Sequence, residues 1–294
     1  MKFVLTGSLG HIGLPLTKQL VADGHDVTVI SSNKNRAASI EQLGADAKIG
    51  NMLDEKFLTD SIKGADGVYL MMSFAHSDEQ GMPNQLSKII GATYSNAIRN
   101  SGVKNVINLS SVGADQGPEV GTLHIYQNIE NAINEVEGIN VTHIRPTSMY
   151  YNLLGDITTI KRADAIYANY PGDVVNSYVA PEDIAPVIAE RLENPKSGVN
   201  VKYVASDEKT GAEVAQILGD TIGKKVKWIE ITDEQKLQSL MNAGISEELA
   251  TGITRMGAAH KLDAFYADYH KNHPTLGSTK LTDFAKEFAK IYNK

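Results

Sequence analysis

Three glycines lie close together near the start of the sequence, at Gly7, Gly10 and Gly13. They follow an apolar, β-branched run at residues 2–6 that predicts a strand, and they open a segment with helical spacing. Such a junction leaves backbone N–H groups free at the positive end of a helix dipole, and glycine lets a diphosphate approach the backbone. We therefore predict a dinucleotide-binding turn, whose residues are Gly7, Ser8, Leu9, Gly10, His11, Ile12 and Gly13.

The segment after the second predicted strand bears on which dinucleotide fits. NAD-binding folds commonly place an Asp or Glu about 20 residues beyond the turn to hold the ribose hydroxyls, whereas residues 31–36 contain no carboxylate. Ser31, Ser32 and Asn33 can instead donate hydrogen bonds to a 2′-phosphate, and Lys34 or Arg36 can add positive charge. We expect NADP(H) to be preferred over NAD(H). If Lys34 and Arg36 are only solvated residues, the preference is lax.

The elements that position this turn alternate between short apolar runs and segments of helical spacing, which predicts βα units around a parallel sheet. The predicted strands are residues 2–6, 26–30, 47–49, 67–72, 105–109 and 140–145. The intervening helices end on glycines suited to a left-handed conformation, namely Gly24, Gly44, Gly64, Gly102 and Gly138. The expected fold class is α/β, a Rossmann-type doubly wound parallel sheet.

The pattern changes after Pro146. Residues 147–179 are expected to form loops with one helix, followed by helical segments and two strands at 200–204 and 225–231. We predict an NAD(P)-binding domain at 1–152 and a smaller C-terminal α/β substrate lobe at 153–294, with some of its elements returning to the Rossmann sheet.

Composition narrows the possible classes of function. The net charge of -7 and the lack of any long Lys/Arg run argue against nucleic acid as a partner. No apolar stretch approaches the roughly 18 residues of a spanning helix, so no membrane partner is expected. The absence of cysteine fits a cytoplasmic protein, and the eight histidines show no metal-binding spacing. We predict no metal.

Several motifs together resemble the NmrA-like group of atypical short-chain dehydrogenases, which includes bacterial NADPH:quinone oxidoreductases and dye reductases. Beyond the glycine turn, the motifs are Gly50-Asn51-Met52-Leu53-Asp54, Asn108-Leu109-Ser110-Ser111-Val112-Gly113-Ala114, Ile144-Arg145-Pro146 with Asn152, and Pro181-Glu182-Asp183-Ile184-Ala185. The resemblance implies that Asn51 and Met52 flank the adenine, although the family more often has Asp where Asn51 stands. It also places cofactor contacts at strand ends, at Met71, Met72, Ser73, Ser110 and Ser111. Plain core packing is the competing interpretation for Met71 and Met72.

We further expect the substrate to lie between Phe74, the segment that contains Thr147, Tyr150 and Tyr151, and the C-terminal lobe. The two tyrosines could stack on a flat molecule, or one could pack inward while the other covers the surface.

The Tyr-x-x-x-Lys pair of classical short-chain enzymes is missing, because none of the twelve tyrosines has a lysine four residues later. In that pair, lysine lowers the tyrosine pKa so that the phenol can act as an acid. Four residues after Tyr126 stands Glu130 instead, and two alignments stay open. In the first, Tyr126 occupies the tyrosine position of the motif. In the second, Glu130 is the helix glutamate that follows the motif, so that Tyr126 occupies the lysine position and Thr122 the tyrosine position. His124 could donate a proton near the nicotinamide or could merely cap a helix.

Hydride transfer to an acceptor that takes its proton from water does not need this acid. We therefore expect an NAD(P)H-dependent oxidoreductase that uses NADPH to reduce a quinone-like or otherwise hydrophobic small molecule. The alternatives are a non-catalytic NADP(H)-binding redox sensor with a regulatory protein partner and, more weakly, a nucleotide-sugar epimerase or dehydratase. A homodimer is a further open expectation.

Overall fold

The computed structural model describes residues 1–72 and 83–294, and these form two compact units. The first comprises residues 1–114, 125–145 and 184–202, and the second comprises residues 115–124, 146–183 and 203–294. The expected domain boundary near residue 152 stays a prediction, because compactness does not test whether either part folds by itself.

A seven-stranded sheet has the order β10-β6-β5-β4-β1-β2-β3. Its strands are β1 (Lys2–Leu5), β2 (Asp26–Ser31), β3 (Asp46–Ile49), β4 (Gly67–Met71), β5 (Asn105–Leu109), β6 (Asn140–Pro146) and β10 (Val199–Val204). Strands β1 to β6 pair in parallel. The predicted Rossmann-type α/β fold is thus confirmed, and each of its six strands lies within about one residue of its expected ends.

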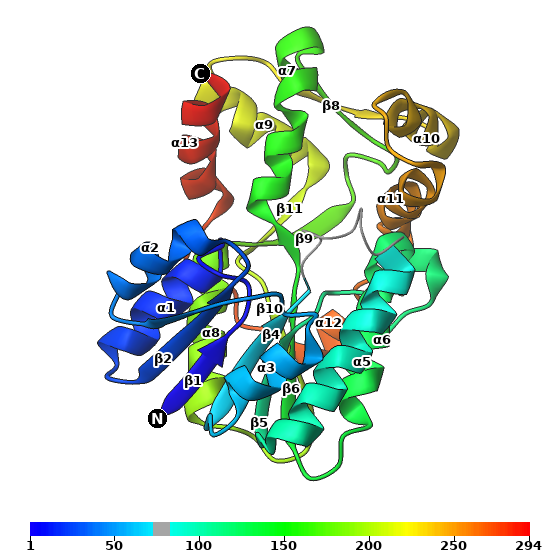
Figure 1. The fold of residues 1–294 in the computed structure, drawn as a ribbon. Coiled ribbons are helices and arrows are strands. Elements are labelled where there is room, and N and C mark those ends of the chain that lie inside the picture. Colours follow the sequence, from blue (N-terminus) through cyan, green and yellow to red (C-terminus); the bar gives the residue numbers. More distant parts are fainter. Residues whose placement is uncertain (73–82) are drawn as a thin grey trace. The chain divides into compact units, whose positions relative to one another are not determined.

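Helices cover this sheet. One side carries α3 (Glu55–Ile62), α5 (Pro83–Ser101) and α6 (Ile125–Asn134), which contact one another in sequence order (Figure 1) and share an apolar core with the strands. The remaining helical segments of the sheet region are α1 (Gly13–Ala22), η1 (Lys34–Arg36), α2 (Ala37–Glu41) and α8 (Pro181–Glu193). All five expected glycine stops have positive φ, between 72° at Gly138 and 84° at Gly44, which favours a residue without Cβ.

The second unit holds two small sheets and its own core. The sheets have the orders β11-β9-β7 and β12-β8. Their strands are β7 (Ser148–Met149), β8 (Ala165–Ala168), β9 (Val175–Val179), β11 (Asp207–Thr210) and β12 (Lys227–Glu230). The helices are η2 (Pro118–His124), η3 (Tyr150–Asp156), α7 (Ile157–Ala163), α9 (Gly211–Ile222), α10 (Asp233–Asn242), α11 (Glu247–Ala259), α12 (Ala267–Asn272) and α13 (Leu281–Tyr292). The expectation of loops with one helix at 147–179 was wrong, because three short strands and two helical segments lie there.

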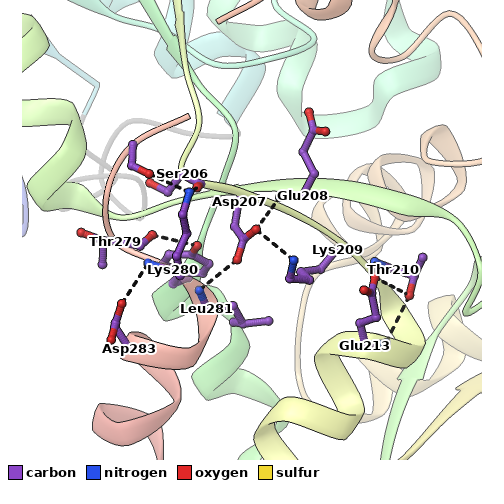
Figure 2. Close-up of polar contacts among 12 residues, drawn as sticks. Ser206, Asp207, Glu208, Lys209, Thr210, Glu213, Thr279, Lys280, Leu281 and Asp283 are labelled. Carbon is purple, nitrogen blue, oxygen red and sulfur yellow. Dashed lines mark hydrogen bonds and ion pairs between the residues drawn. The ribbon is translucent and has the colours of Figure 1, made fainter. Parts of the chain in front are cut away.

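Polar contacts attach the C-terminal helix α13 to this unit (Figure 2). The Lys280 ammonium donates to the carbonyls of Ser206 and Gly277, at 2.6 and 2.8 Å. The Asp207 carboxylate accepts from the Leu281 N–H at 3.2 Å and pairs with Lys209. These bonds position α13 so that its apolar face, including Phe284 and Phe288, completes the core of the second unit.

Candidate functional site

The glycine turn is shaped by two residues with left-handed backbone, Gly7 (φ 88°) and Ser8 (φ 57°). The Ser8 N–H donates to the Ile30 carbonyl at 3.0 Å, which fixes the turn against the end of β2. A Cβ at Gly7 would overlap the Met71 side chain, and a Cβ at Gly13 would overlap the Ser8 carbonyl. Close packing of the chain on itself therefore explains two of the three glycines.

Gly10 differs from its two neighbours in the motif. It is exposed, its φ is not positive, and a Cβ there would meet only the Gly7 carbonyl oxygen, at 3.4 Å. Neither packing nor backbone strain requires glycine at this position. The missing side chain instead leaves the backbone open toward the cavity that Gly10 lines.

That cavity has a volume of about 350 Å³ and lies at the carboxyl ends of the parallel strands, where open α/β sheets bind ligands. Its lining consists of Gly7, Ser8, Leu9, Gly10, Ile30, Ser31, Ser32, Asn33, Arg36, Gly50, Asn51, Met52, Leu53 and Met71. Eleven of these fourteen residues are predicted cofactor contacts. The structure thus brings the predicted turn, the end of β2 and the segment after β3 together around one space.

Two buried hydroxyls hold the walls of this cavity in place. The Thr6 hydroxyl donates to the Tyr69 carbonyl at 3.1 Å and accepts from the Met71 N–H at 3.0 Å, which ties the end of β1 to the end of β4. The Tyr94 hydroxyl, on α5, donates to the Met71 carbonyl at 2.6 Å and lies 3.2 Å from the Met52 sulfur. Burial raises the pKa of Tyr94, so this phenol stays protonated and acts as a donor.

The charge of the lining favours an anion. Among the described residues that line the cavity, Arg36 is the only charged side chain and none is a carboxylate. Ser31 is buried and its hydroxyl accepts from the Asn33 N–H at 3.2 Å, whereas Ser32, Asn33 and Arg36 are exposed. The buried Ser8 hydroxyl oxygen has no hydrogen-bond partner within the described chain. A phosphate beside these groups would gain donors and positive charge.

Six predicted cofactor contacts in the described chain lie outside the lining of this cavity. They are His11, Ile12, Gly13, Met72, Ser110 and Ser111. Ile12, Gly13 and Met72 are buried, and Met72 belongs to the apolar core under α3, α5 and α6. The exposed His11 and the partly buried Ser111 remain predictions, as does Ser73, which with Phe74 lies outside the described residues.

Three lining residues were not anticipated: Ile30, Gly50 and Leu53. Gly50 and Leu53 belong to a motif that carried the family resemblance, so the signal was present for both. A Cβ at Gly50 would press into the Phe57 ring, which explains the glycine. Ile30 is the last apolar residue before Ser31, and nothing in its type marks it as a cavity residue.

Ser110 enters a buried ion pair. Its hydroxyl donates to Glu130 Oε1 at 2.6 Å, and the same carboxylate accepts from Arg145 Nε at 3.0 Å and Nη2 at 2.7 Å. Burial opposes ionisation of Glu130, but the Arg145 hydrogen bond and the nearby positive charges hold its pKa below the usual value. The carboxylate is thus committed to fixing the end of β5 against β6 and α6.

The two candidate proton donors have different surroundings. Tyr126 is partly buried against the core of the first unit. His124, in the second unit, lies with Nδ1 2.6 Å from the Gly121 carbonyl, at the end of η2. This contact fits a capping role, and a catalytic role for either residue stays a prediction.

The predicted substrate residues of the second unit lie near its core. Tyr150 is buried between Tyr178 and Phe284, with ring centroids 6.1 and 5.5 Å away, and its hydroxyl donates to the Thr279 carbonyl. Tyr151 is partly buried against the same core. Thr147 is buried, and its hydroxyl has no partner among the described residues.

Comparison with known proteins decides the family. The model of the NmrA-like family matches residues 2–284, which is nearly the whole chain. The chain belongs to the NmrA-like family. The NAD(P)H azoreductase of Xenophilus azovorans is similar in sequence to this chain. The two are 23% identical over 290 residues, and the match covers 98% of this chain and 97% of the relative.

Two solved structures share the fold of this NmrA-like chain. The triphenylmethane reductase of Citrobacter sp., complexed with NADP(H), has a TM-score of 0.77 and 23% identity, with 98% of this chain and 99% of that chain covered. The NADPH-dependent quinone oxidoreductase QOR2 of Escherichia coli, complexed with NADPH, has a TM-score of 0.77 and 19% identity, with 97% and 99% covered.

Two absences concern only residues 1–72 and 83–294. No helix there combines the length and the apolar character needed to cross a bilayer. Nor does this part of the chain contain a group of three or more His, Cys, Asp or Glu residues placed to hold a metal ion.

Proposed function

We propose that this NmrA-like protein is an NADPH-dependent reductase of a small, hydrophobic, quinone-like acceptor. The observation that carries the proposal is the cavity at the glycine turn. The fold has room for a side chain at position 10, yet the residue there is glycine, which leaves its backbone open to the cavity. The names of the azoreductase, the dye reductase and the quinone oxidoreductase support the same class of reaction.

The cavity fits a dinucleotide in three parts. The diphosphate would lie on the backbone of the turn at Gly10 and at the start of α1, which is the positive end of the helix dipole. The adenine would lie between the Arg36 side and the segment with Asn51 and Met52. A 2′-phosphate would meet Ser32, Asn33 and Arg36 without facing a carboxylate, which favours NADP(H).

The acceptor follows from the missing Tyr-x-x-x-Lys pair. The nicotinamide would supply a hydride, that is, one proton with two electrons, and a quinone that receives it takes its second proton from water. The residues of the chain then need only to hold the two molecules in contact and in orientation. Epimerase and dehydratase chemistry is disfavoured, because it depends on the tyrosine acid. We place the enzyme in the cytoplasm.

Two titrations test this function. NADPH and NADH are titrated by nicotinamide fluorescence, and a panel of quinones, azo dyes and triarylmethane dyes is then screened at saturating NADPH. We expect tighter binding of NADPH and turnover of at least one acceptor class. Binding of NADPH without oxidation by any acceptor would overturn the reductase.

The missing Tyr-x-x-x-Lys pair also fits a second function, a redox sensor that regulates a protein partner. A sensor must distinguish the two redox states, because a ligand shifts only an equilibrium between states that it binds differently. Calorimetric titration with NADP and NADPH separates the two functions: equal affinities would count against sensing.

A further inference from the structure

One phenol proton lies between two residues that line the cavity at the glycine turn. The Tyr94 hydroxyl donates to the Met71 carbonyl oxygen at 2.6 Å, and the Met52 sulfur lies 3.2 Å from the same hydroxyl. Tyr94 is 0% exposed, so its proton is withheld from bulk water. Because a thioether sulfur is a weak hydrogen-bond acceptor, the carbonyl takes the proton, and the Tyr94 hydroxyl holds the end of β4.

Met52 stands where a small molecule can reach it. Its side chain is partly exposed and lines the cavity of about 350 Å³. The backbone on both sides of Met52 is fixed, because Asn51 Oδ1 accepts from the Leu53 N–H and the Asp54 carboxylate accepts from the Phe57 N–H, both at 3.0 Å. A chemical change at the sulfur is therefore met by the side chains around it rather than by movement of this segment.

Oxidation of the Met52 sulfur would alter the competition for this proton. A hydroperoxide transfers one oxygen atom to a methionine sulfur and leaves as water or an alcohol, while the sulfur loses two electrons. The product is a sulfoxide, whose polar oxygen is a much stronger acceptor than the thioether. At Met52 this oxygen would compete with the Met71 carbonyl for the single proton of Tyr94. The end of β4 would then lose the bond that holds it in the cavity wall.

We propose that Met52 is a site of reversible oxidation by hydroperoxides, and that its sulfoxide weakens dinucleotide binding by drawing the Tyr94 hydroxyl away from the Met71 carbonyl. The inference rests on the proposed function, because Met52 lines the cavity assigned to NADPH. That function also supplies the oxidant: a hydroquinone that gives two electrons and two protons to oxygen forms hydrogen peroxide and regenerates the quinone. Oxidation of Met52 would limit the NADPH consumed in such a cycle.

Oxidation and binding must oppose each other in both directions. If the sulfoxide weakens NADPH binding, bound NADPH disfavours the sulfoxide by the same factor, because the coupling between two sites is reciprocal. A dinucleotide in the cavity would also cover Met52 and slow its reaction with peroxide.

Hydrogen peroxide is the probe, applied to the full chain with and without saturating NADPH. Peptide mass spectrometry measures the gain of one oxygen atom at each methionine, and fluorescence titration measures Kd for NADPH after the peroxide is removed. We expect Met52 to be oxidised, more slowly when NADPH is bound, and Kd to rise about tenfold. Methionine sulfoxide reductases with a thiol should restore both the thioether and the original Kd.

Three variants separate Met52 from the other methionines. Met52→Leu keeps a similar volume without sulfur, so peroxide should leave its Kd for NADPH at whatever value it has before treatment. Met241→Leu makes the same change at a residue of α10 that is 39% exposed, and it should respond to peroxide like the parent. In Tyr94→Phe the shared proton is absent, so oxidation of Met52 should raise Kd less than in the parent. Circular dichroism before and after treatment establishes that each protein is folded.

Four results would each overturn the proposal: an unmodified Met52 in a chain whose Met241 is oxidised, an unchanged Kd once Met52 carries the oxygen, the full loss of affinity in Met52→Leu, or an equal loss in Tyr94→Phe. Failure of the untreated parent to bind NADPH would refute the proposed function, and this proposal with it. The two failures are distinguishable, because the second is seen before any peroxide is added.

Discussion

Replacing Gly10 by alanine isolates the ligand-binding role of the turn from its structural role. The new methyl group would lie 3.4 Å from the Gly7 carbonyl oxygen, an ordinary contact, and the backbone there has no positive φ to strain. Substitutions at such exposed positions usually change stability by less than about 0.5 kcal/mol. For a chain of this size we therefore expect the melting temperature to shift by no more than about 2 °C.

Affinity should respond far more strongly than stability. The methyl group would occupy the space in which a diphosphate approaches the backbone N–H groups, and each hydrogen bond to a charged group contributes about 1.5–3 kcal/mol. Loss of one such bond corresponds to about 10- to 100-fold weaker binding. Fluorescence titration with NADPH measures the affinity, and differential scanning fluorimetry measures the melting temperature.

Gly13→Ala is the matched control. Its methyl group would overlap the Ser8 carbonyl, so the melting temperature itself should fall. Gly10→Ala should thus lower the affinity for NADPH without lowering the melting temperature, whereas Gly13→Ala should lower the melting temperature. This difference is expected if Gly10 leaves space for a ligand and Gly13 is required by packing. If Gly10→Ala bound NADPH as tightly as the parent, the assignment of this cavity to a dinucleotide would be refuted.

Three further predictions concern other residues of the chain. Arg36→Met should weaken NADPH binding about tenfold without changing NADH binding, because a charge-assisted bond to the 2′-phosphate is lost. Ser32→Glu should favour NADH, because its carboxylate repels the 2′-phosphate of NADPH. An unchanged ratio of NADPH to NADH affinity in either variant would contradict this assignment of the 2′-phosphate. Tyr94→Phe removes the donor to the Met71 carbonyl, so the protein should lose about 1 kcal/mol of stability, measured by urea denaturation, and bind NADPH less tightly; unchanged values would show that this hydroxyl does not hold the cavity wall. Asp156→Asn should melt at a higher temperature than the parent at pH 8 and lose that advantage toward pH 4. The reason is that burial raises the pKa of the Asp156 carboxyl in the folded protein to about 6, so its contribution to stability is full at low pH and is lost as the pH rises through 6. A difference in melting temperature that does not change with pH would contradict this prediction.

The Rossmann sheet was predictable because its signals are local. Most of its strands are apolar runs, and the helices between them are followed by glycines such as Gly24 or Gly102, whose positive φ the structure confirms. The cavity at the glycine turn was largely predictable for the same reason, since parallel strands bring their carboxyl ends to one edge of the sheet.

The second unit was harder to predict because its elements depend on distant partners. Strand β11 (Asp207–Thr210) is polar throughout, and it is a strand because it pairs with β9 more than 25 residues earlier. The rings of Tyr170, Trp228 and His260 lie in contact, although no spacing in the sequence connects these residues. The unpaired His260 Nδ1 becomes visible only when each buried polar atom of the described chain is matched with its neighbours.

The route of the chain limits how this protein can be altered by cutting or recombination. The polypeptide passes from one compact unit to the other five times, after residues 114, 124, 145, 183 and 202. No single cut yields either unit intact, and a grafted C-terminal fragment would leave residues 115–124 and 146–183 without their core. We therefore expect that exchange of one continuous segment between relatives yields chimeras that do not fold. Individual substitutions are then the route by which the specificity of this fold can change.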